Sequence, residues 1–331
     1  MSFKDIAGNE QVKHILRLSL SKGRLPNSLL LAGPAGSGKL KTALTVAKAL
    51  NCLEQTDDSC DHCDSCLRAE RGQHPNIRLI RREKNREQIV KEQVEEINYL
   101  ARLRPWSQGR LVFIIDEADR MNETVANSLL KTLEEPRDFA YFILVTEELQ
   151  LILPTIRSRC QVLRFNPLSQ AEVEKALLEK GLPAEKARLL AAASEGNLEA
   201  VLEVTWEELI AGRNQAWLMF KQLLESVGAE DFLNLVAGRG RKDSLSSFRE
   251  VLKFFSVFFR DLLVIHKGQE QYLLNPDLRP ELEKLSRLVP AGKAASAVTL
   301  VEDYLGRLKK NPNLAIMSNE LVIFFREIRN V

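Results

Sequence analysis

One stretch of the sequence, LLLAGPAGSGKLKTA, restricts what this chain can fold into more than any other. Its apolar start predicts a buried strand, and its apolar-periodic end predicts a helix. Between them lies a glycine-rich turn, in which backbone N–H groups can point at phosphate oxygens because no Cβ stands in the way. The lysine at the helix start would reach the β- and γ-phosphates of a nucleotide. The stretch therefore predicts a phosphate-binding loop formed by Gly33, Pro34, Ala35, Gly36, Ser37, Gly38, Lys39, Leu40 and Lys41.

Position 40 departs from the usual pattern of such a loop, which has Ser or Thr there to hold a magnesium ion. Leu40 has no hydroxyl. The loss of a charge-assisted contact of this kind costs roughly 1.5–3 kcal/mol, which is one to two powers of ten in affinity. Thr42 cannot supply the missing hydroxyl. Two residues along a helix correspond to a rotation of about 200° around its axis, so the side chain of Thr42 faces away from that of residue 40. We therefore expect ATP and magnesium to bind weakly or not at all at this site, and hydrolysis there to be inefficient.

Short apolar runs alternate with helical patterns in the first half of the chain, which is typical of an α/β domain with a parallel sheet covered by helices. Expected strands are Ser28–Ala32, Asn76–Ile80, Leu111–Ile115, Tyr141–Val145 and Gln161–Phe165, and expected helices include Leu40–Leu50, Glu87–Leu103 and Glu123–Leu133. The strand signals then stop. Because 331 residues are too many for one ordinary core, we expect an α/β domain at 1–165, a small helical domain at 166–205 and an all-helical domain at 206–331.

The expected strand Leu111–Ile115 ends at two carboxylates, Asp116 and Glu117. Ligands bind at the carboxyl ends of strands in such sheets, so Asp116 is expected to hold the magnesium shell and Glu117 to polarise the attacking water. Taken alone, this stretch favours a simpler interpretation, in which the two acids only cap the next helix. The presence of a phosphate loop in the same chain favours the interpretation of the two acids as a catalytic pair. This pair is vestigial if the site no longer hydrolyses ATP.

Four of the five cysteines lie within fifteen residues, as Cys52, Cys60, Cys63 and Cys66. Thiolates are typical zinc ligands, and four of them make a closed tetrahedral site with a structural role. Buried reduced cysteines and an iron–sulfur cluster are the alternatives, and the spacing favours zinc. His62 lies among the four thiols but has no ligand position left to fill.

Three further motifs resemble the clamp-loader AAA+ proteins of bacterial DNA polymerase III. They are DEAD at 116–119, ANSLLKTLEEP at 126–136 and TIRSRC at 155–160. The resemblance covers the first two domains well, reaches the third only in length and helicity, and is strongest to delta-prime subunits. It implies an AAA+ nucleotide-binding domain with a zinc module at 52–66, a helical lid domain, and a helical collar domain for oligomerisation.

In this family the Ser-Arg-Cys motif presents an arginine finger to the ATP of a neighbouring subunit, and the matching residue here is Arg159. Motor subunits also carry an arginine after a Gly-Ser pair in the sensor-2 stretch, whereas the matching stretch here, SEGNLEAVLEV, has none. The loss of this arginine and of the hydroxyl at position 40 implies a stator, a subunit without ATPase activity of its own that completes another subunit's site. Nucleotidyltransferase activity would belong only to the DNA polymerase complex as a whole.

The resemblance also implies the partners: gamma/tau-like motor subunits and a delta-like wrench subunit, in a hetero-oligomer that loads the sliding clamp on primed DNA during DNA replication. Primer–template DNA would be held through the complex, so a formal net charge of only +2 is no objection. Without a signal-peptide pattern or an apolar run of ~20 residues, we expect a soluble cytoplasmic protein of the bacterial replisome with no membrane partner. Two alternatives stay open: an active gamma/tau-like motor, and a stand-alone AAA+ DNA helicase or remodeller.

Two other patterns are less specific. The basic cluster of Arg78, Arg81, Arg82, Lys84 and Arg86 is interleaved with glutamates, which favours a solvated face over direct contact with DNA. The stretch FREVLKFFSVFFRDLL has apolar residues at helical spacing. Such a stripe is typical of a helical core. Because the third domains of the resembled family assemble into a circular collar, the resemblance implies that part of the stripe faces another subunit.

Overall fold

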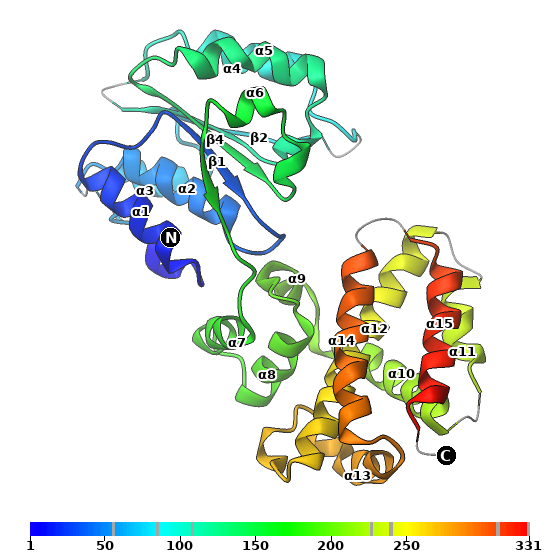
Figure 1. The fold of residues 1–331 in the computed structure, drawn as a ribbon. Helices are drawn as coiled ribbons and strands as arrows, with labels where there is room; N and C mark the ends of the chain where they lie inside the picture. The colour runs from blue at the N-terminus through cyan, green and yellow to red at the C-terminus, as the bar shows by residue number, and fades with distance from the viewer. Residues whose placement is uncertain are drawn as a thin grey trace. The chain divides into compact units, whose positions relative to one another are not determined.

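The computed structural model describes residues 1–54, 57–83, 86–106, 109–225, 228–237, 241–308 and 312–329, without the side chains of 237 and 241–243. The chain forms two compact units (Figure 1). The first comprises Met1–Val173 and Gly196–Glu199, and the second comprises Glu174–Glu195 and Ala200–Val331. The expected division into three domains at 165 and 205 stays a prediction.

A parallel sheet forms the centre of the first unit, and in the described part of the chain it has five strands. They are β1 (Ser28–Ala32), β2 (Ile77–Ile80), β3 (Leu111–Ile115), β4 (Ala140–Thr146) and β5 (Gln161–Arg164). Their order across the sheet is β2-β3-β4-β1-β5. The five expected strands are thus confirmed, and no end differs by more than one residue.

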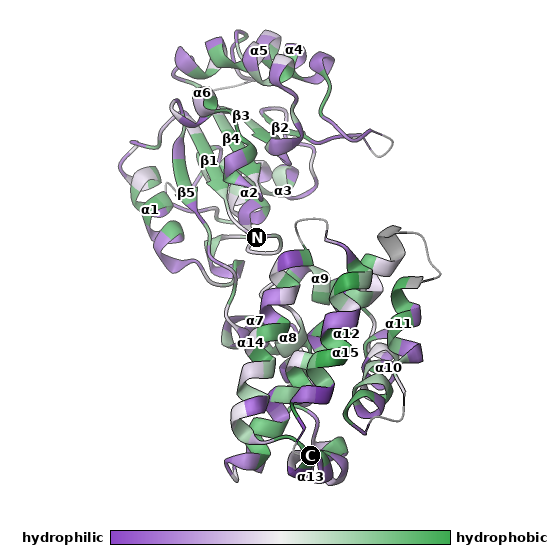
Figure 2. Ribbon diagram, turned by 45° about the vertical axis from the view of Figure 1, so that its right-hand side comes forward, coloured by the Kyte–Doolittle hydropathy of each residue, from purple (hydrophilic) through white to green (hydrophobic). Residues whose placement is uncertain are grey.

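Helices cover both faces of this sheet (Figure 1). They are α1 (Glu10–Ser21), α2 (Lys39–Leu50), α3 (Asp64–Glu70), α4 (Lys91–Leu100), α5 (Glu123–Glu134) and α6 (Pro154–Arg157), with short 3-10 turns η1 (Phe3–Asp5), η2 (Ala118–Arg120) and η3 (Leu149–Leu151). Leu16 of α1 and Val46 of α2 pack with Val112 on one face, and Leu129 of α5 packs with Phe113 on the other. Successive side chains of a strand point to opposite faces, so a strand covered on both sides is apolar throughout (Figure 2).

The chain after β5 is helical. The helices are α7 (Gln170–Glu179), α8 (Ala184–Ala193), α9 (Leu198–Glu203), α10 (Trp206–Glu225), α11 (Glu230–Ala237), α12 (Arg241–His266), α13 (Arg279–Leu288), α14 (Ala291–Arg307) and α15 (Leu314–Glu327), with η4 (Glu270–Tyr272) and η5 (Pro276–Leu278). Phe220 of α10 lies 4.8 to 5.7 Å, between ring centroids, from Phe255 and Phe259 of α12 and Phe325 of α15. Within the described residues, no helix combines the length and apolarity that crossing a membrane requires.

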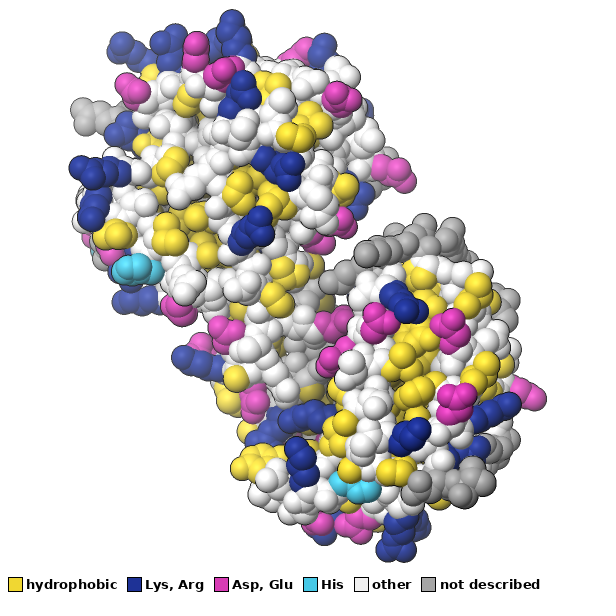
Figure 3. Space-filling view, viewed as in Figure 1, with side chains coloured by type: hydrophobic (Ala, Val, Ile, Leu, Met, Phe, Trp, Pro, Cys, Tyr) yellow, Lys and Arg dark blue, Asp and Glu magenta, His cyan; other side chains and the backbone are white. Residues whose placement is uncertain are grey.

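The apolar stripe on α12 lies inside the second unit. Its five phenylalanines are each at most 1% exposed, namely Phe248, Phe254, Phe255, Phe258 and Phe259. The expectation that part of this stripe faces another subunit is therefore wrong, because the neighbouring helices α10 and α15 cover it. Exposed apolar side chains lie instead on α15, where Ile316 and Ile323 are more than half exposed, and Figure 3 shows hydrophobic side chains over α14 and α15.

Candidate functional site

The predicted phosphate loop connects β1 to α2, as its pattern requires. Gly36 and Gly38 have φ values of 67° and 87°, in the left-handed region that favours glycine. Lys39 begins α2, and only 6% of it is exposed. Its Nζ donates a hydrogen bond of 2.6 Å to the carbonyl oxygen of Pro34. The amine that would bind a phosphate is therefore engaged by the loop itself.

Carboxylates surround this lysine. Burial lowers the pKa of Lys39, and four acids oppose that shift, namely Glu147, Glu199, Asp116 and Asp119. Only Asp116 among them was predicted from the sequence to be a site residue. Asp119 and Glu199 lie in the DEAD and SEGNLEAVLEV stretches without a predicted role, and Glu147 lies in no motif. An anionic phosphate placed at Lys39 would meet these negative charges.

Leu40 is partly buried and packs against the apolar cluster of this face of the sheet, which includes Phe3 and Ile6. An apolar side chain packed against the core thus stands where a working loop has a magnesium-binding hydroxyl. Thr42 is fully buried, and its Oγ1 donates a hydrogen bond of 2.8 Å to the carbonyl oxygen of Gly38. Its hydroxyl is therefore committed to the helix backbone.

Two asparagines that sequence reasoning missed as site residues lie on the loop. A Cβ added to Gly36 would lie 1.9 Å from the Oδ1 of Asn197, so this side chain rests directly on the turn. The Nδ2 of Asn9 donates to the carbonyl oxygens of Ser37, at 3.3 Å, and of Asn166, at 3.1 Å. Asn9 belongs to no motif, and Asn197 lies in the SEGNLEAVLEV stretch, which gave no signal of a contact with this loop.

Asp116 and Glu117 follow β3, as predicted. Burial raises the pKa of Asp116, and the nearby guanidinium of Arg81 opposes this shift. The Nε of Arg81 lies 3.1 Å from Oδ2 of Asp116, and the Nε of Arg82 lies 2.7 Å from Oε2 of Glu117. Both candidate catalytic acids are thus ion-paired within the chain. Glu117 also has a φ of 52°, an uncommon backbone conformation for a residue other than glycine.

These ion pairs revise the interpretation of the basic cluster. Arg81 and Arg82 are about half exposed, as expected for a solvated face, yet their guanidinium groups are turned to the two acids. Arg78 and Arg86 are exposed, and Lys84 lies outside the described residues. The pattern of charges along the sequence contained no signal for the pairing, because it depends on which strand lies beside β3.

Arg159 lies in the turn between α6 and β5. Its Nη1 donates to the carbonyl oxygen of Thr155 at 2.9 Å, and its Nη2 lies 3.2 Å from Oε1 of Glu134. The side chain is 29% exposed. Cys160, the next residue, is buried in the core between α5 and the sheet, and burial raises its pKa to about 12. In the Ser-Arg-Cys motif, the Cys160 side chain is therefore buried in the core, and the Arg159 side chain lies near the surface.

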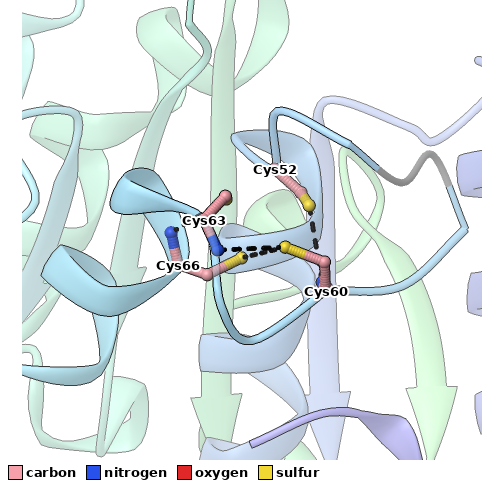
Figure 4. A group of neighbouring side chains, drawn as sticks. All are labelled: Cys52, Cys60, Cys63 and Cys66. Atoms are coloured by element: carbon pink, nitrogen blue, oxygen red, sulfur yellow. Dashed lines mark hydrogen bonds between the residues drawn. The ribbon is translucent and has the colours of Figure 1, made fainter.

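The four cysteines of the predicted zinc module converge (Figure 4). Their Sγ atoms all lie within 4.8 Å of one another, and those of Cys60 and Cys66 are 3.9 Å apart. Zn–S bonds of ~2.3 Å in a tetrahedron place the sulfurs ~3.8 Å apart, so the arrangement fits a zinc ion. The backbone N–H groups of Cys60, Cys63 and Cys66 each donate to a sulfur of the cluster, which stabilises thiolates.

The cysteine module is tied to the N-terminus and to α2. The ammonium group of Met1 lies 3.0 Å from Asp61 and 3.1 Å from Glu70. Lys48 of α2 lies 2.6 Å from the same two acids. Burial alone would lower the pKa of Lys48, but its hydrogen bonds to the two carboxylates outweigh burial and raise it. This network was not predicted, since it joins three segments separated in the sequence.

Comparisons with known proteins agree along the chain. Residues 8–169 match the family described as DNA polymerase III, delta subunit, and residues 207–323 match DNA polymerase III, delta subunit, C terminal. The DNA polymerase III subunit delta' of Bacillus subtilis is 30% identical over 336 residues, which cover 99% of each chain. The DNA polymerase III subunit tau of Escherichia coli is 31% identical over 223 residues, but these cover 65% of this chain and only 34% of tau.

Similar solved structures include the RuvB Holliday junction branch migration motor of Thermotoga maritima, with a TM-score of 0.42 and 20% identity over 80% of this chain and 79% of RuvB. The parallel sheet, the phosphate loop after β1 and the helical second unit agree with the AAA+ fold class expected from the sequence. Because the delta' relative aligns from end to end, the chain belongs to the clamp-loader family of bacterial DNA polymerase III and is most similar to its delta-prime subunits.

Proposed function

We propose that this chain is a stator of the DNA polymerase III clamp loader, which donates Arg159 to the ATP of a neighbouring subunit. Its partners are then gamma/tau-like motor subunits and a delta-like wrench subunit, in a hetero-oligomer that loads the sliding clamp on primed DNA. Support comes from the end-to-end similarity to a delta' subunit, whereas the match to tau covers only 34% of tau. DNA polymerase activity belongs to the whole complex and not to this chain.

The observation that carries the proposal is the state of the chain's own phosphate loop. Leu40 packs against the core, Lys39 is hydrogen-bonded to Pro34, and Asn197 rests on Gly36. Each of these features opposes nucleotide binding in a different part of the loop. A chain that keeps the arginine finger while its own loop is obstructed is suited to serve a neighbour's site.

The residues around Asp116 do not fit a magnesium ion. Magnesium requires oxygen ligands in near-octahedral geometry, and Leu40 offers none. The carboxylates of Asp116 and Glu117 each face a guanidinium group instead. We therefore assign no catalytic step to these two acids and regard them as vestigial.

Arg159 is suited to act on a neighbour. Its planar guanidinium can donate two parallel hydrogen bonds to phosphate oxygens. Within this chain it is held by one carbonyl group and by the exposed carboxylate of Glu134. The Arg159 side chain is partly exposed and Glu134 is more than half exposed, so solvent weakens this ion pair and the phosphates of a neighbour's ATP can displace it.

Zinc is the metal that the cysteine module suits. Cys52, Cys60, Cys63 and Cys66 would hold it and leave no open position for a substrate. A zinc ion bound there would supply a structural cross-link and no catalysis.

An active gamma/tau-like motor is the second candidate, favoured by the intact glycines and by Lys39. ATP turnover of the isolated chain, of the motor subunit and of the reconstituted complex separates the two candidates. The stator proposal predicts background turnover for the isolated chain, and clamp- and DNA-stimulated turnover that requires this chain in the complex. Turnover by the isolated chain would establish a motor, and self-assembled rings that separate DNA strands would establish a helicase.

A change at position 40 tests the obstruction directly. We expect Leu40→Thr to raise the affinity of the isolated chain for magnesium–ATP by about one to two powers of ten, because one charge-assisted contact contributes about 1.5–3 kcal/mol. The affinity is measured by titration with a fluorescent ATP analogue. Leu44→Thr is the matched control, since Leu44 packs against the same cluster one turn later. An affinity unchanged by Leu40→Thr would mean that other features block the loop.

A further inference from the structure

Two adjacent arginines, Arg81 and Arg82, are engaged with the two acids on which a nucleotide-bound metal ion would depend. The Nε of Arg81 lies 3.1 Å from Asp116, and the Nε of Arg82 lies 2.7 Å from Glu117. Asp116 is the more buried acid, with 18% of its side chain exposed. Consecutive basic residues thus pair one to one with consecutive acidic residues.

We infer that these two guanidinium groups take the place of a divalent cation, so that the chain's own site excludes magnesium and any nucleoside triphosphate bound there is metal-free. The inference deepens the proposed function, and it rests on the claim that this site does not turn ATP over. It assigns that failure to specific residues in addition to Leu40.

The sheet holds the arginines in this position. β2 pairs with β3 in parallel, with Ile80 beside Ile115, and the backbone N–H of Asp116 donates to the carbonyl oxygen of Ile80 at 3.0 Å. Since parallel strands keep their register, the next residue of each chain segment lies beside its counterpart, which places Arg81 next to Asp116. The Nε2 of Gln93 also donates to the carbonyl oxygen of Arg81 at 2.8 Å. The pairing therefore follows from strand order and is more than a chance contact of long surface side chains.

The chemistry of the pair opposes a metal ion. A guanidinium group has donors but no lone pair to offer, so it satisfies a carboxylate and cannot join the coordination sphere of a cation. Its positive charge also repels a divalent cation brought to the same oxygens. The third acid after β3 is engaged as well, because the hydroxyl of Thr146 donates to Oδ1 of Asp119 at 2.7 Å and Arg120 lies 3.8 Å from its Oδ2.

The test is the magnesium dependence of nucleotide binding by the full-length chain. A fluorescent ATP analogue is titrated with excess magnesium and again with EDTA. For the wild-type chain we expect affinities within threefold of each other, or no binding in either buffer. For the double variant Arg81→Gln/Arg82→Gln we expect magnesium to raise the affinity at least tenfold. The same pair of changes is also made in the Leu40→Thr chain, where the missing hydroxyl does not limit binding.

The matched control is Arg78→Gln/Arg86→Gln, which removes two positive charges from the same segment and leaves both acids paired. Circular dichroism and thermal unfolding establish that each variant is folded, and the single change Arg81→Gln serves if the double variant is not. A folded variant that gains no magnesium dependence in either background overturns the inference. So does a wild-type chain whose affinity already rises tenfold with magnesium.

The result separates this inference from the proposed function. If the arginine variants gain no magnesium dependence while Arg159→Ala still lowers turnover of the complex, only the inference fails. If they gain it while Arg159→Ala leaves turnover unchanged, the stator proposal fails and the description of the chain's own site stands.

Discussion

We expect the replacement of Arg159 with alanine to lower the clamp- and DNA-stimulated ATP turnover of the reconstituted clamp loader at least tenfold, although the phosphate loop of this chain is untouched. The physical reason is that an arginine supplied in trans stabilises the negative charge of the transition state. This raises the rate of hydrolysis at the neighbouring site by about three to five powers of ten. Single-turnover hydrolysis at that site is expected to fall about a thousandfold. The steady-state ATP turnover of the complex falls less if its other ATP sites still hydrolyse ATP. Phosphate release at fixed subunit concentrations measures both.

The control for this prediction is Arg157→Ala, which removes an equal charge two residues away. Size-exclusion chromatography must show that both variant complexes assemble. Unchanged turnover with Arg159→Ala in an intact complex would mean that Arg159 is structural. The chain would then be a scaffold, or a motor that uses its own site.

The second large effect is expected at the cysteine module, from loss of the zinc ion that we propose it binds. We expect one zinc ion per purified chain, and we expect Cys66→Ser to abolish zinc binding and to unfold the module at 52–66. Structural zinc contributes an apparent 10–16 kcal/mol of binding free energy to small zinc-finger peptides at neutral pH, and that free energy is folding free energy. Cys66 is fully buried, and its loss leaves only three thiols for a site that four complete. Elemental analysis and limited proteolysis measure the two outcomes.

Cys160→Ala is the matched control, since Cys160 is a buried thiol that lies in the core beside α5 and outside the cluster. The Cys160→Ala variant should keep its zinc ion, and its residues 52–66 should stay resistant to limited proteolysis. A full zinc content in Cys66→Ser would contradict the four-cysteine site, and iron in place of zinc would favour the iron–sulfur alternative. Because Asp61 and Glu70 hold Met1 and Lys48, cleavage in the Cys66→Ser variant is also expected near the N-terminus.

Local patterns were enough to predict the sheet and the parts of the candidate site that are contiguous in sequence. β3 is a clear case, because a strand covered on both faces must be apolar at every position, and its end therefore located Asp116 and Glu117. The position of the candidate phosphate loop between β1 and α2 was equally predictable, since its glycines and Lys39 follow a strand directly. The stripe on α12 shows the limit of such patterns: periodicity identified an apolar face, but not whether another helix of the same chain covers it.

The sequence by itself determined which residues could form a phosphate loop, that position 40 lacks a magnesium ligand, and that four thiols are close enough in the chain to share one metal ion. Only the tertiary structure decided what each of these groups contacts. Arg82 and Glu117 are 35 residues apart, and they meet because β2 lies beside β3 in a parallel register. Asn197 rests on Gly36 because a segment far along the chain returns to the first unit. Periodicity specifies the face on which a side chain lies, whereas its partner depends on strand order and register, which are set by packing of the whole unit.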